Sequence, residues 1–280
     1  MDYKAQSCAF CGSGALKLIS HKLTDGNVFY TYRCEACGET FSTETAYLAR
    51  KAREEKRAAM EQATKQKKAV PAAPSGTLDA PEIYRRNRNS VVELTADKGD
   101  CVGSGTGMVL PGGYVLTNAH VVFSKEKENA TRVQAADSLI GVTADKRRFA
   151  FDIVYADVRR DMALIVSDDL AAPAVTFADG DVTIGEKVYA IGNSKGQGIC
   201  MLDGIVSDRE RFISGERYIM YSAPTVGGNS GGPLFNAHGE VIGMVTLGQK
   251  DGSLMNYAIP TGVLKAFLRE AEEKEGITVF

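Results

Sequence analysis

The sequence lacks any apolar run of about 18 residues or more, the length that a helix needs to cross the hydrocarbon core of a bilayer. It also lacks a strong net charge, because 33 Lys and Arg side chains face 35 Asp and Glu side chains, which gives a formal charge of −2 at pH 7. Such a balance offers no broad basic field to a polyanion. We therefore expect a globular protein that does not span a membrane and that does not have nucleic acid as its first partner.

The first eight residues lack the basic region, apolar stretch and small-residue cleavage site of a secretory signal. Cysteine is scarce, and four of the six cysteines fall in two close pairs, whereas Cys101 and Cys200 are isolated. In a reducing compartment this pattern indicates a metal site plus two thiols that act as small buried side chains. The expected location is therefore the cytoplasm.

Composition divides the chain into three regions. Residues 1–42 hold the paired cysteines between short apolar runs, which is consistent with small hairpins around a metal. Residues 43–80 begin with a stretch rich in Ala, Glu, Lys, Arg and Gln, which favours a charged helix over 43–68, and continue with a Pro/Ala linker that breaks it. A solvated spacer helix is the simplest interpretation, and a contact with nucleic acid or a membrane surface is the alternative. Residues 81–280 form the main domain.

The main domain is predicted to be mainly β. Short β-branched runs separated by Gly, Asp and Asn are expected to form strands at 91–95, 107–110, 114–117, 153–155, 163–166, 187–191, 204–207, 218–221, 241–246 and 256–259. Many short strands at this spacing indicate barrels or a sandwich. A helical period returns only at the end, where Thr261 is expected to cap a helix that stops near Gly276.

Three local patterns in the main domain carry the chemistry. The first is the glycine-rich GSGTGMV at 103–109, followed by YVLTNAHVV at 114–122, which places His120 just past a strand. The second is DMALI at 161–165, with Asp161 at the head of an apolar strand. The third is GGNSGGPL at 227–234, which surrounds Ser230 with glycine. Along the chain they give the order His, Asp, Ser.

These residue types suit nucleophilic catalysis. A serine hydroxyl is a poor nucleophile at neutral pH, so a base must take its proton, and imidazole titrates in the right range. His120 is the natural base, because His21 lies between the cysteine pairs and His238 follows Ser230 too closely, in an expected turn. The glycines before Ser230 favour a tight turn whose amides converge on one point, as an oxyanion hole requires. We assign its donors to the amides of Gly228 and Ser230.

The three patterns resemble those of the trypsin-like serine peptidases, and most of all the HtrA/Deg branch, over about residues 85–270. The resemblance implies a chymotrypsin-like double β-barrel with a C-terminal helix. It also implies a serine endopeptidase that acts on proteins or peptides through an acyl-enzyme, with a triad of His120, Asp161 and Ser230 in which Asp161 orients the imidazole. Many HtrA relatives carry a C-terminal PDZ domain, and with 20 residues after Pro260 we expect none in this sequence. A homo-oligomer is left open.

The residues expected to line the substrate pocket include no acidic side chain. Residues 222–227, which line the pocket in the fold that the chain resembles, contain no acid, so a basic substrate side chain would be buried there unpaired. We expect cleavage after small or medium aliphatic residues, with walls from Thr225, Val226, Val245, Thr246 and Leu247. Asn229 is neutral where pancreatic-type relatives carry an acid, which predicts activity without removal of a pro-segment. Val226 and Gly227 replace the usual Asn-Pro, which leaves the resting state of this loop open.

Two Cys-x-x-Cys-Gly motifs, at Cys8/Cys11 and Cys34/Cys37, have 22 residues between them and resemble the knuckles of a zinc ribbon. Four thiolates at this spacing close a tetrahedral Zn(2+) shell, and so short a segment is expected to fold only with its metal. A redox dithiol pair and disulfides are the alternatives. The expected role is structural, with a protein partner docking on the ribbon as the first hypothesis and nucleic-acid contact as the second.

Two functions of different classes remain open from the sequence. The first is a working serine endopeptidase. The second is a catalytically silent scaffold that binds peptides in its groove and docks through its zinc ribbon. A variant of the first makes the ribbon and the basic helix a nucleic-acid tether for the protease, which would show salt-sensitive binding.

Overall fold

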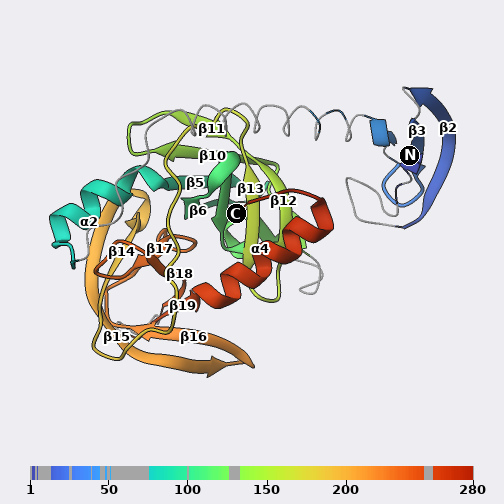
Figure 1. Ribbon diagram of the computed structural model, residues 1–280. Helices are drawn as coiled ribbons and strands as arrows, with labels where there is room; N and C mark the ends of the chain where they lie inside the picture. Colours follow the sequence, from blue (N-terminus) through green and yellow to red (C-terminus); the bar gives the residue numbers. More distant parts are fainter. Residues whose placement is uncertain are drawn as a thin grey trace. The chain divides into compact units, whose positions relative to one another are not determined.

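A computed structural model describes residues 2–3, 5, 14–24, 27–38, 40–44, 48, 51, 76–99, 101–125, 133–248 and 255–279. Contacts divide the chain into two units, Met1–Val70 and Pro71–Phe280, and each unit is described here by itself (Figure 1). Most of the predicted helix at 43–68 and most of the predicted linker lie outside the described residues, as do Cys8 and Cys11.

The N-terminal unit contains a small antiparallel sheet. Strand β2 (Leu16–Thr24) pairs with β3 (Asn27–Cys34), which also pairs with β4 (Thr40–Ser42) and, in parallel, with β1 (Asp2–Tyr3). Tyr32 is buried on β3, and its ring lies 5.9 Å from the ring of Phe41 on β4. Phe29 and Cys34 on the same strand are also buried, so β3 is the central strand of this small sheet.

The larger unit opens with a helix that the sequence analysis did not predict. In α2 (Ala80–Asn87), the side chain of Asp79 accepts a hydrogen bond from the Glu82 amide at 2.9 Å, and Pro81 lies in the first turn. Both features favour a helix start. The helix buries Ile83 in the core between the two sheets that follow, which explains why so short a segment is helical.

Seven strands form the first sheet, in the order β11-β10-β5-β6-β7-β13-β12. Their bounds are β5 (Val91–Asp97), β6 (Val102–Val109), β7 (Tyr114–Thr117), β10 (Ser138–Thr143), β11 (Arg148–Ala150), β12 (Asp152–Asp157) and β13 (Met162–Val166). A helical turn, α3 (Ala119–Val122), follows β7, and the small pair β8 (Phe123–Lys125) and β9 (Val133–Ala135) follows that turn.

The first sheet is barrel-like but not closed by hydrogen bonds, which refines the prediction of two barrels. Its two edge strands, β11 and β12, are consecutive in the chain and separated only by Phe151. Phe151 is buried, and its ring leaves no room for a side chain at Gly141 on β10. The chain therefore passes directly from one edge of the sheet to the other, and covalent continuity wraps the sheet around its core.

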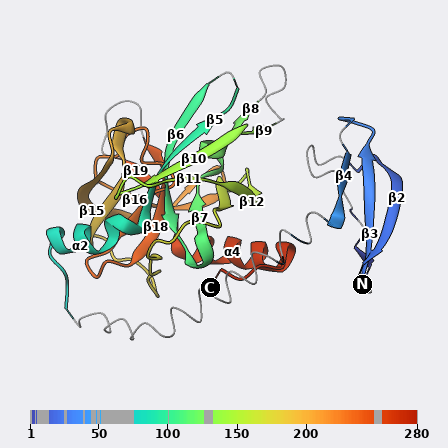
Figure 2. The same cartoon turned by 90° about the horizontal axis from the view of Figure 1, so that it is seen from above.

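The second sheet is a closed barrel in the order β14-β15-β16-β19-β18-β17. Its strands are β14 (Lys187–Asn193), β15 (Ile199–Ile213), β16 (Glu216–Tyr221), β17 (Pro233–Phe235), β18 (Val241–Gly248) and β19 (Asn256–Pro260). A short 3-10 turn, η3 (Ser194–Gly196), joins β14 to β15. Figure 2 shows the two sheets from a second direction. Every predicted strand run overlaps a strand of one of the two sheets.

The C-terminal helix α4 (Thr261–Glu275) forms where the sequence predicted it and ends at Gly276, whose φ of 59° is left-handed. The prediction that Thr261 caps the helix is wrong. Pro260 occupies the cap position, and the Thr261 hydroxyl instead donates to the Val241 carbonyl of β18 at 2.8 Å. This bond fixes the start of α4 on the barrel, because a buried hydroxyl takes a protein acceptor when one is near.

One continuous core joins the two sheets to both helices. It contains Ile83 from α2, Met108 from the first sheet, Phe235 and Met244 from the barrel and Phe267 from α4, all with no exposed surface. Residues placed at the seam between the sheets are therefore held by packing from both sides.

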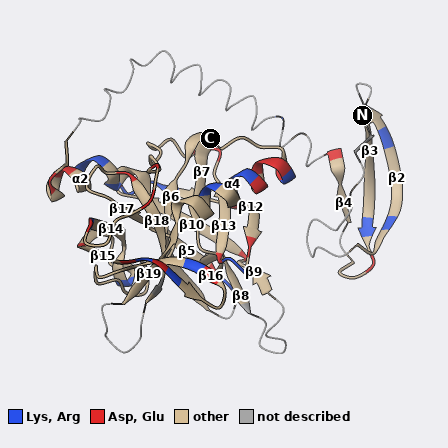
Figure 3. Cartoon of the chain, turned by 60° about the horizontal axis from the view of Figure 1, so that its bottom comes forward, with Lys and Arg blue, Asp and Glu red and all other residues tan. Residues whose placement is uncertain are grey.

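Helices α2 and α4 each carry charges of both signs (Figure 3). Within the described part of the chain, no helix has the length and apolar character needed to cross a bilayer.

Candidate active site

His120 and Asp161 form a direct pair at the seam. The α3 turn presents His120 just after β7, and its Nδ1 lies 2.8 Å from Oδ2 and 3.0 Å from Oδ1 of Asp161. The backbone amide of His120 also donates to Asp161 Oδ1 at 2.9 Å. Because the carboxylate engages Nδ1, this ring nitrogen carries the proton and Nε2 carries the lone pair, which is the tautomer that a general base needs.

Asp161 is held by several groups at once. It lies in the turn between β12 and β13 with a φ of 57°, a left-handed conformation that few non-glycine residues adopt. Its carbonyl accepts a hydrogen bond from Asn118 Nδ2 at 2.9 Å, and its Oδ2 accepts one from Thr246 Oγ1 at 2.6 Å. The carboxylate is therefore oriented by the surrounding structure before any substrate arrives.

Ser230 reaches the same place from the second barrel. Its Oγ donates to the Thr246 carbonyl at 3.4 Å, while the Thr246 hydroxyl contacts Asp161. Thr246 thus contacts two of the three predicted triad residues, Asp161 and Ser230. His120 is joined to them through its own hydrogen bond to Asp161. Among the described residues, Ser230 and His120 share no direct hydrogen bond. The structure brings the three side chains together, with the serine hydroxyl resting on a backbone carbonyl.

The site is open to a ligand on the histidine side. The His120 side chain is 49% exposed, whereas that of Asp161 is 22% exposed. A substrate therefore has access to the imidazole, and the carboxylate behind it is partly screened from water, which strengthens the interaction between them.

The turn around Ser230 is anchored through its backbone carbonyls. The Gly227 carbonyl accepts the Lys195 amide at 2.7 Å, and the Asn229 carbonyl accepts the Gly232 amide at 3.0 Å. In a trans peptide the N–H points opposite to the C=O, so the amides of Gly228 and Ser230 point away from these anchors. Within the described part of the chain, neither amide donates to a protein acceptor.

Gly228 must be glycine in this turn. Its φ is 97°, and a Cβ there would lie 2.1 Å from the Asn193 carbonyl oxygen. Only a residue without a side chain allows the turn to press this closely against the end of β14.

Lys98 is a site residue that the sequence analysis missed. Its Nζ donates to the carbonyls of His120 at 2.7 Å and Phe123 at 3.0 Å, which lie in and just after the α3 turn. Burial lowers the pKa of Lys98. A lysine at a hairpin, 22 residues before its partner in the sequence, gives no local signal of this role.

The expected pocket walls fall into different environments. Thr225 is half-buried, with its Oγ1 3.1 Å from the Tyr221 hydroxyl, and Val226 is 42% exposed at the rim. Val245 packs inside the barrel, and Thr246 lies at the triad rather than in a pocket wall. The side chain of Leu247 lies outside the described residues. Burial raises the pKa of Tyr221 well above its usual range, so this hydroxyl stays neutral behind Thr225.

Gly248 and Asn256 lie close to Thr225. A Cβ at Gly248 would lie 3.0 Å from Asn256 Oδ1 and 3.7 Å from the Thr225 carbonyl oxygen. Asn256 is buried, and its Nδ2 donates to the Ala223 carbonyl at 2.9 Å. Gly248 ends β18, two residues beyond the predicted strand 241–246, and Asn256 begins the next predicted strand, so neither was considered as part of the pocket.

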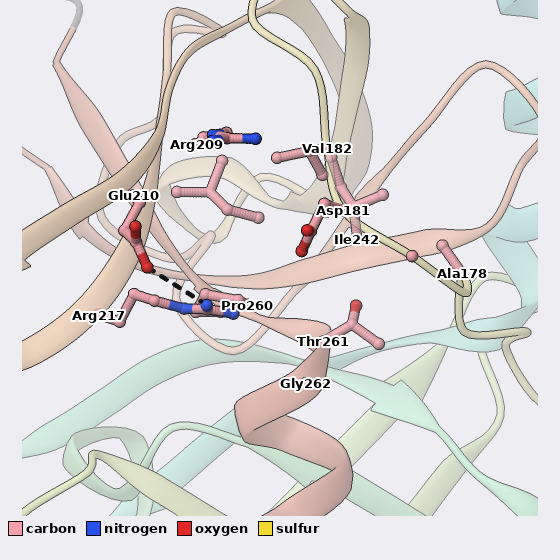
Figure 4. Close-up of a pocket in the computed structure, with 12 residues that line it drawn as sticks. Ala178, Asp181, Val182, Arg209, Glu210, Arg217, Ile242, Pro260, Thr261 and Gly262 are labelled. Carbon is pink, nitrogen blue, oxygen red and sulfur yellow. Dashed lines mark hydrogen bonds and ion pairs between the residues drawn. The ribbon is translucent and has the colours of Figure 1, made fainter.

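A separate cavity of about 190 Å³ lies in the second barrel and contains no triad residue (Figure 4). Arg209, Glu210 and Arg217 line one side, with Arg217 next to the start of α4, and Asp181 and Val182 lie across from them. Arg217 Nη1 pairs weakly with Glu210 Oε1 at 3.4 Å. This cavity is not the peptidase site.

The expected metal ligands are described only in part. Cys34 is buried at the end of β3, and Cys37 is exposed in the next turn, where the Gly38 amide donates to the Cys34 carbonyl at 2.9 Å and Gly38 has a φ of 80°. A tight turn of this kind suits two neighbouring metal ligands. Among the described residues, no group of three or more metal-binding side chains is assembled, and Cys8 and Cys11 lie outside them.

The two isolated cysteines are not buried as expected. Cys101 is exposed, and Cys200 is half-buried with its Sγ donating to Ser194 Oγ at 3.1 Å. Both lie beside turns rather than in a core, which the spacing of cysteines in a sequence does not reveal.

Comparison with known proteins is consistent with this geometry. Residues 105–244 match the model of the trypsin-like peptidase domain. A protein of Pseudomonas putida (strain W619), named "Probable periplasmic serine endoprotease DegP-like", is 32% identical over 197 residues, which cover 65% of this chain and 39% of that protein. A protein of the same name from Halomonas elongata is 34% identical, over 57% of this chain and 33% of that protein. The chain thus spans well under half the length of these curated relatives.

Solved structures show the same fold. The "HtrA-type protease AlgW with tripeptide" superposes with a TM-score of 0.62 and 29% identity, covering 71% of this chain and 64% of that one. The serine endoprotease from Yersinia pestis gives a TM-score of 0.61 and 25% identity, covering 74% and 69%. Mainly β architecture with barrel-like sheets and few helices is common to all of them.

The names of the curated relatives correct one prediction. These relatives are named probable periplasmic serine endoproteases, which contradicts the cytoplasmic location expected from the cysteine pattern and the first residues. The cysteine argument was indirect. Thiols that bind a metal, or that lie apart from one another, can stay unpaired in an oxidising compartment as well.

Proposed function

Because the chain belongs to the trypsin-like peptidase family, we propose that it is a serine endopeptidase that hydrolyses protein or peptide substrates. The observation that carries the proposal is the grouping of His120, Asp161 and Ser230 around Thr246. Three segments far apart in the sequence converge there, and a merely structural serine or histidine needs no such convergence.

The proposed reaction uses each group in turn. Ser230 Oγ attacks the carbonyl carbon of the substrate, and His120 Nε2 takes its proton. The resulting oxyanion is stabilised by the amides of Gly228 and Ser230. His120 then gives the proton to the leaving amine as the C–N bond breaks, which leaves an acyl-enzyme. Water, deprotonated by the same imidazole, cleaves the ester and restores Ser230, while Asp161 stabilises the imidazolium throughout.

Attack requires one local movement. The Ser230 hydroxyl leaves the Thr246 carbonyl and turns toward His120, and its long 3.4 Å hydrogen bond makes this change inexpensive. Substrate binding and rotation of one side chain are enough to complete the catalytic arrangement.

The test is casein hydrolysis together with labelling by a fluorophosphonate, in wild type and in Ser230→Ala. We expect wild type to show both activities and Ser230→Ala to lose both. Ser167→Ala is the matched control, because Ser167 is a serine of the same unit that follows the end of β13 farther from Asp161. Absence of labelling between pH 6 and 9 in wild type would instead support the peptide-binding scaffold.

For specificity we propose cleavage after small or medium aliphatic residues. The stretch 222–227 has no acid, and Thr225, Gly248 and Asn256 border one uncharged spot. A basic side chain there would remain unpaired at a cost of several kcal/mol. A peptide library profiled by mass spectrometry tests this, and a profile led by Arg or Lys before the cut bond would overturn it.

For the N-terminal unit we propose a structural zinc site formed by Cys8, Cys11, Cys34 and Cys37, with a protein partner docking on the ribbon. The turn at Cys34 and Cys37 fits adjacent metal ligands, and zinc supplies the stability that the small sheet lacks. Metal analysis of the purified protein tests the site, and a capture experiment with residues 1–70 as bait, compared with the Cys34→Ser form, tests the docking role.

A further inference from the structure

The glycine-rich segment at 103–109 has a role that the triad does not explain. Gly105 and Gly107 face one side of β6, where a Cβ would lie 2.6 Å from the Val121 side chain and 2.3 Å from that of Val115. Successive residues of a strand point to opposite faces, so Thr106 between them points the other way. The two glycines let β6 pack tightly, and the threonine side chain is directed toward the second barrel.

Every polar group of Thr106 has a partner, and two of the four partners, Gly228 and Ser230, belong to the turn at residues 227–232. Its Oγ1 donates to the Gly228 carbonyl at 2.6 Å and accepts from the Asn193 amide at 2.9 Å. Its backbone amide donates to the Ser230 carbonyl at 2.8 Å, and its carbonyl accepts from Thr117 Oγ1 at 2.7 Å. Thr106 has no exposed surface. A fully satisfied buried group of this kind fixes the parts that it joins.

These contacts fall on either side of the two oxyanion donors. The carbonyls of residues 227 and 229 accept hydrogen bonds from the amides of Lys195 and Gly232, which belong to the second barrel. The carbonyls of 228 and 230 accept theirs from Thr106. With all four carbonyls held, the peptide planes cannot rotate, and the amides of Gly228 and Ser230 keep their direction. Thr106 supplies two of these four anchors from the other sheet.

We propose that Thr106 is the positioning residue of the oxyanion hole, with its hydroxyl holding, across the seam between the two sheets, the peptide between Gly228 and Asn229 that links the two donor peptides. This inference rests on the proposed peptidase function. Thr106 touches no substrate atom and acts through the Gly228 and Ser230 peptides, so its loss alters the stabilisation of the transition state rather than substrate binding.

The test compares Thr106→Val, which keeps the shape and removes the hydroxyl, with Thr106→Ser, which keeps the hydroxyl. On a peptide substrate we expect Thr106→Val to lower kcat about 10- to 100-fold, less than the loss of an oxyanion donor itself, with KM changed by no more than about twofold. Thr106→Ser is expected to restore kcat to within about threefold of wild type. Thr143→Val is the control, because Thr143 is an equally buried threonine on β10 whose hydroxyl bonds Asp145 and Arg147.

Hydrogen exchange by mass spectrometry gives a second measurement that needs no activity. The Thr106→Val protein is expected to exchange faster at residues 192–196 and 229–232, with the rest of the described larger unit unchanged. Unchanged exchange there together with unchanged kcat would overturn the inference, as would a Thr106→Ser protein as impaired as Thr106→Val. If wild type neither hydrolyses peptides nor labels, the proposed function fails, and the exchange of the two variants still decides the role of Thr106.

Discussion

Asp161 combines a left-handed backbone with a carboxylate that holds His120 by both its ring nitrogen and its amide. Asp161→Asn keeps the shape, but it can present an N–H to Nδ1 and so favours the wrong imidazole tautomer. We expect kcat/KM to fall about 10³- to 10⁴-fold, by analogy with the same change in other triads. Steady-state hydrolysis of a peptide measures it.

The matched control for Asp161→Asn is Asp203→Asn. Asp203 is an exposed partner of Lys187 in the second barrel, and its neutralisation is expected to leave hydrolysis within about twofold of wild type. Equal losses in the two variants would argue against a catalytic role for Asp161.

Gly228 offers a second test at the residue scale. Gly228→Ala introduces both a strained φ and a Cβ that would lie 2.1 Å from a backbone oxygen. We expect the turn to shift and kcat to fall at least about 100-fold, the magnitude associated with loss of an oxyanion donor. Gly215→Ala is the control, because Gly215 has a similar φ of 84° at a hairpin tip with no atom within 4 Å of the added Cβ. Comparable activity of the two variants would contradict the assignment of the oxyanion hole.

At the scale of elements, Arg160 ties the turn that carries Asp161 to helix α4. Its Nε lies 2.6 Å from Asp157 Oδ2, and its Nη1 lies 2.9 Å from Glu270 Oε1 on α4. The hydrogen bond from Arg160 lowers the pKa of Glu270, and although burial opposes the change, hydrogen bonds from Arg160 also lower the pKa of Asp157. Carboxyl groups with depressed pKa values stabilise the fold above their unfolded pKa, and this stability is lost as the pH falls through the folded values.

Arg160→Met therefore has a pH-dependent effect on stability. At pH 7 we expect the free energy of unfolding to fall by about 1–2 kcal/mol, and the difference from wild type to shrink below about pH 4, where both carboxyls take up protons. Thermal unfolding followed by circular dichroism from pH 3 to 7 measures both. Arg85→Met, which removes an exposed ion pair on α2, is expected to have little effect at any pH. A difference for Arg160→Met that stayed constant over this range would rule out the ionic origin.

The elements were easier to predict than their contacts. Runs such as 114–117 and 241–246 alternate or cluster β-branched residues, so local pattern is enough to place the strands. The order of motifs placed Ser230, His120 and Asp161 on three turns, and the structure brings those turns together. The α2 helix was missed because its start signals sit in a short charged segment, and its stability comes from burying Ile83 in a distant core.

Contacts between distant segments were out of reach of sequence patterns. Thr246 was expected in a pocket wall, yet its hydroxyl bonds Asp161 and its carbonyl bonds Ser230, because its place in β18 is fixed by pairing with β17 and β19. Lys98 and Thr106 act on turns far along the chain, and nothing in their local sequence distinguishes them from other strand-end residues. Side-chain direction across a seam emerges only once both sheets are in place.

At the scale of the whole molecule, contacts divide the chain into two units, and the hydrophobic core clusters of the described residues lie in the larger one. The described residues of the catalytic group and the core around it belong to Pro71–Phe280, whereas Cys34 and Cys37 belong to Met1–Val70. Zinc bound to the four cysteines would stabilise the small sheet, and it has no part in the proposed reaction. Metal loss and peptide hydrolysis are therefore expected to be independent.

The full chain carrying Cys34→Ser and Cys37→Ser tests this independence. We expect its zinc content to fall to background, because two ligands cannot hold the ion, while kcat/KM on a short peptide stays within about twofold of wild type. Cys101→Ser is the control, since Cys101 is exposed in the larger unit and its loss is expected to change neither quantity. Loss of hydrolysis together with the metal would show that the N-terminal unit acts on the active site. Wild-type protein without bound zinc would instead favour a dithiol or disulfide role for the four cysteines.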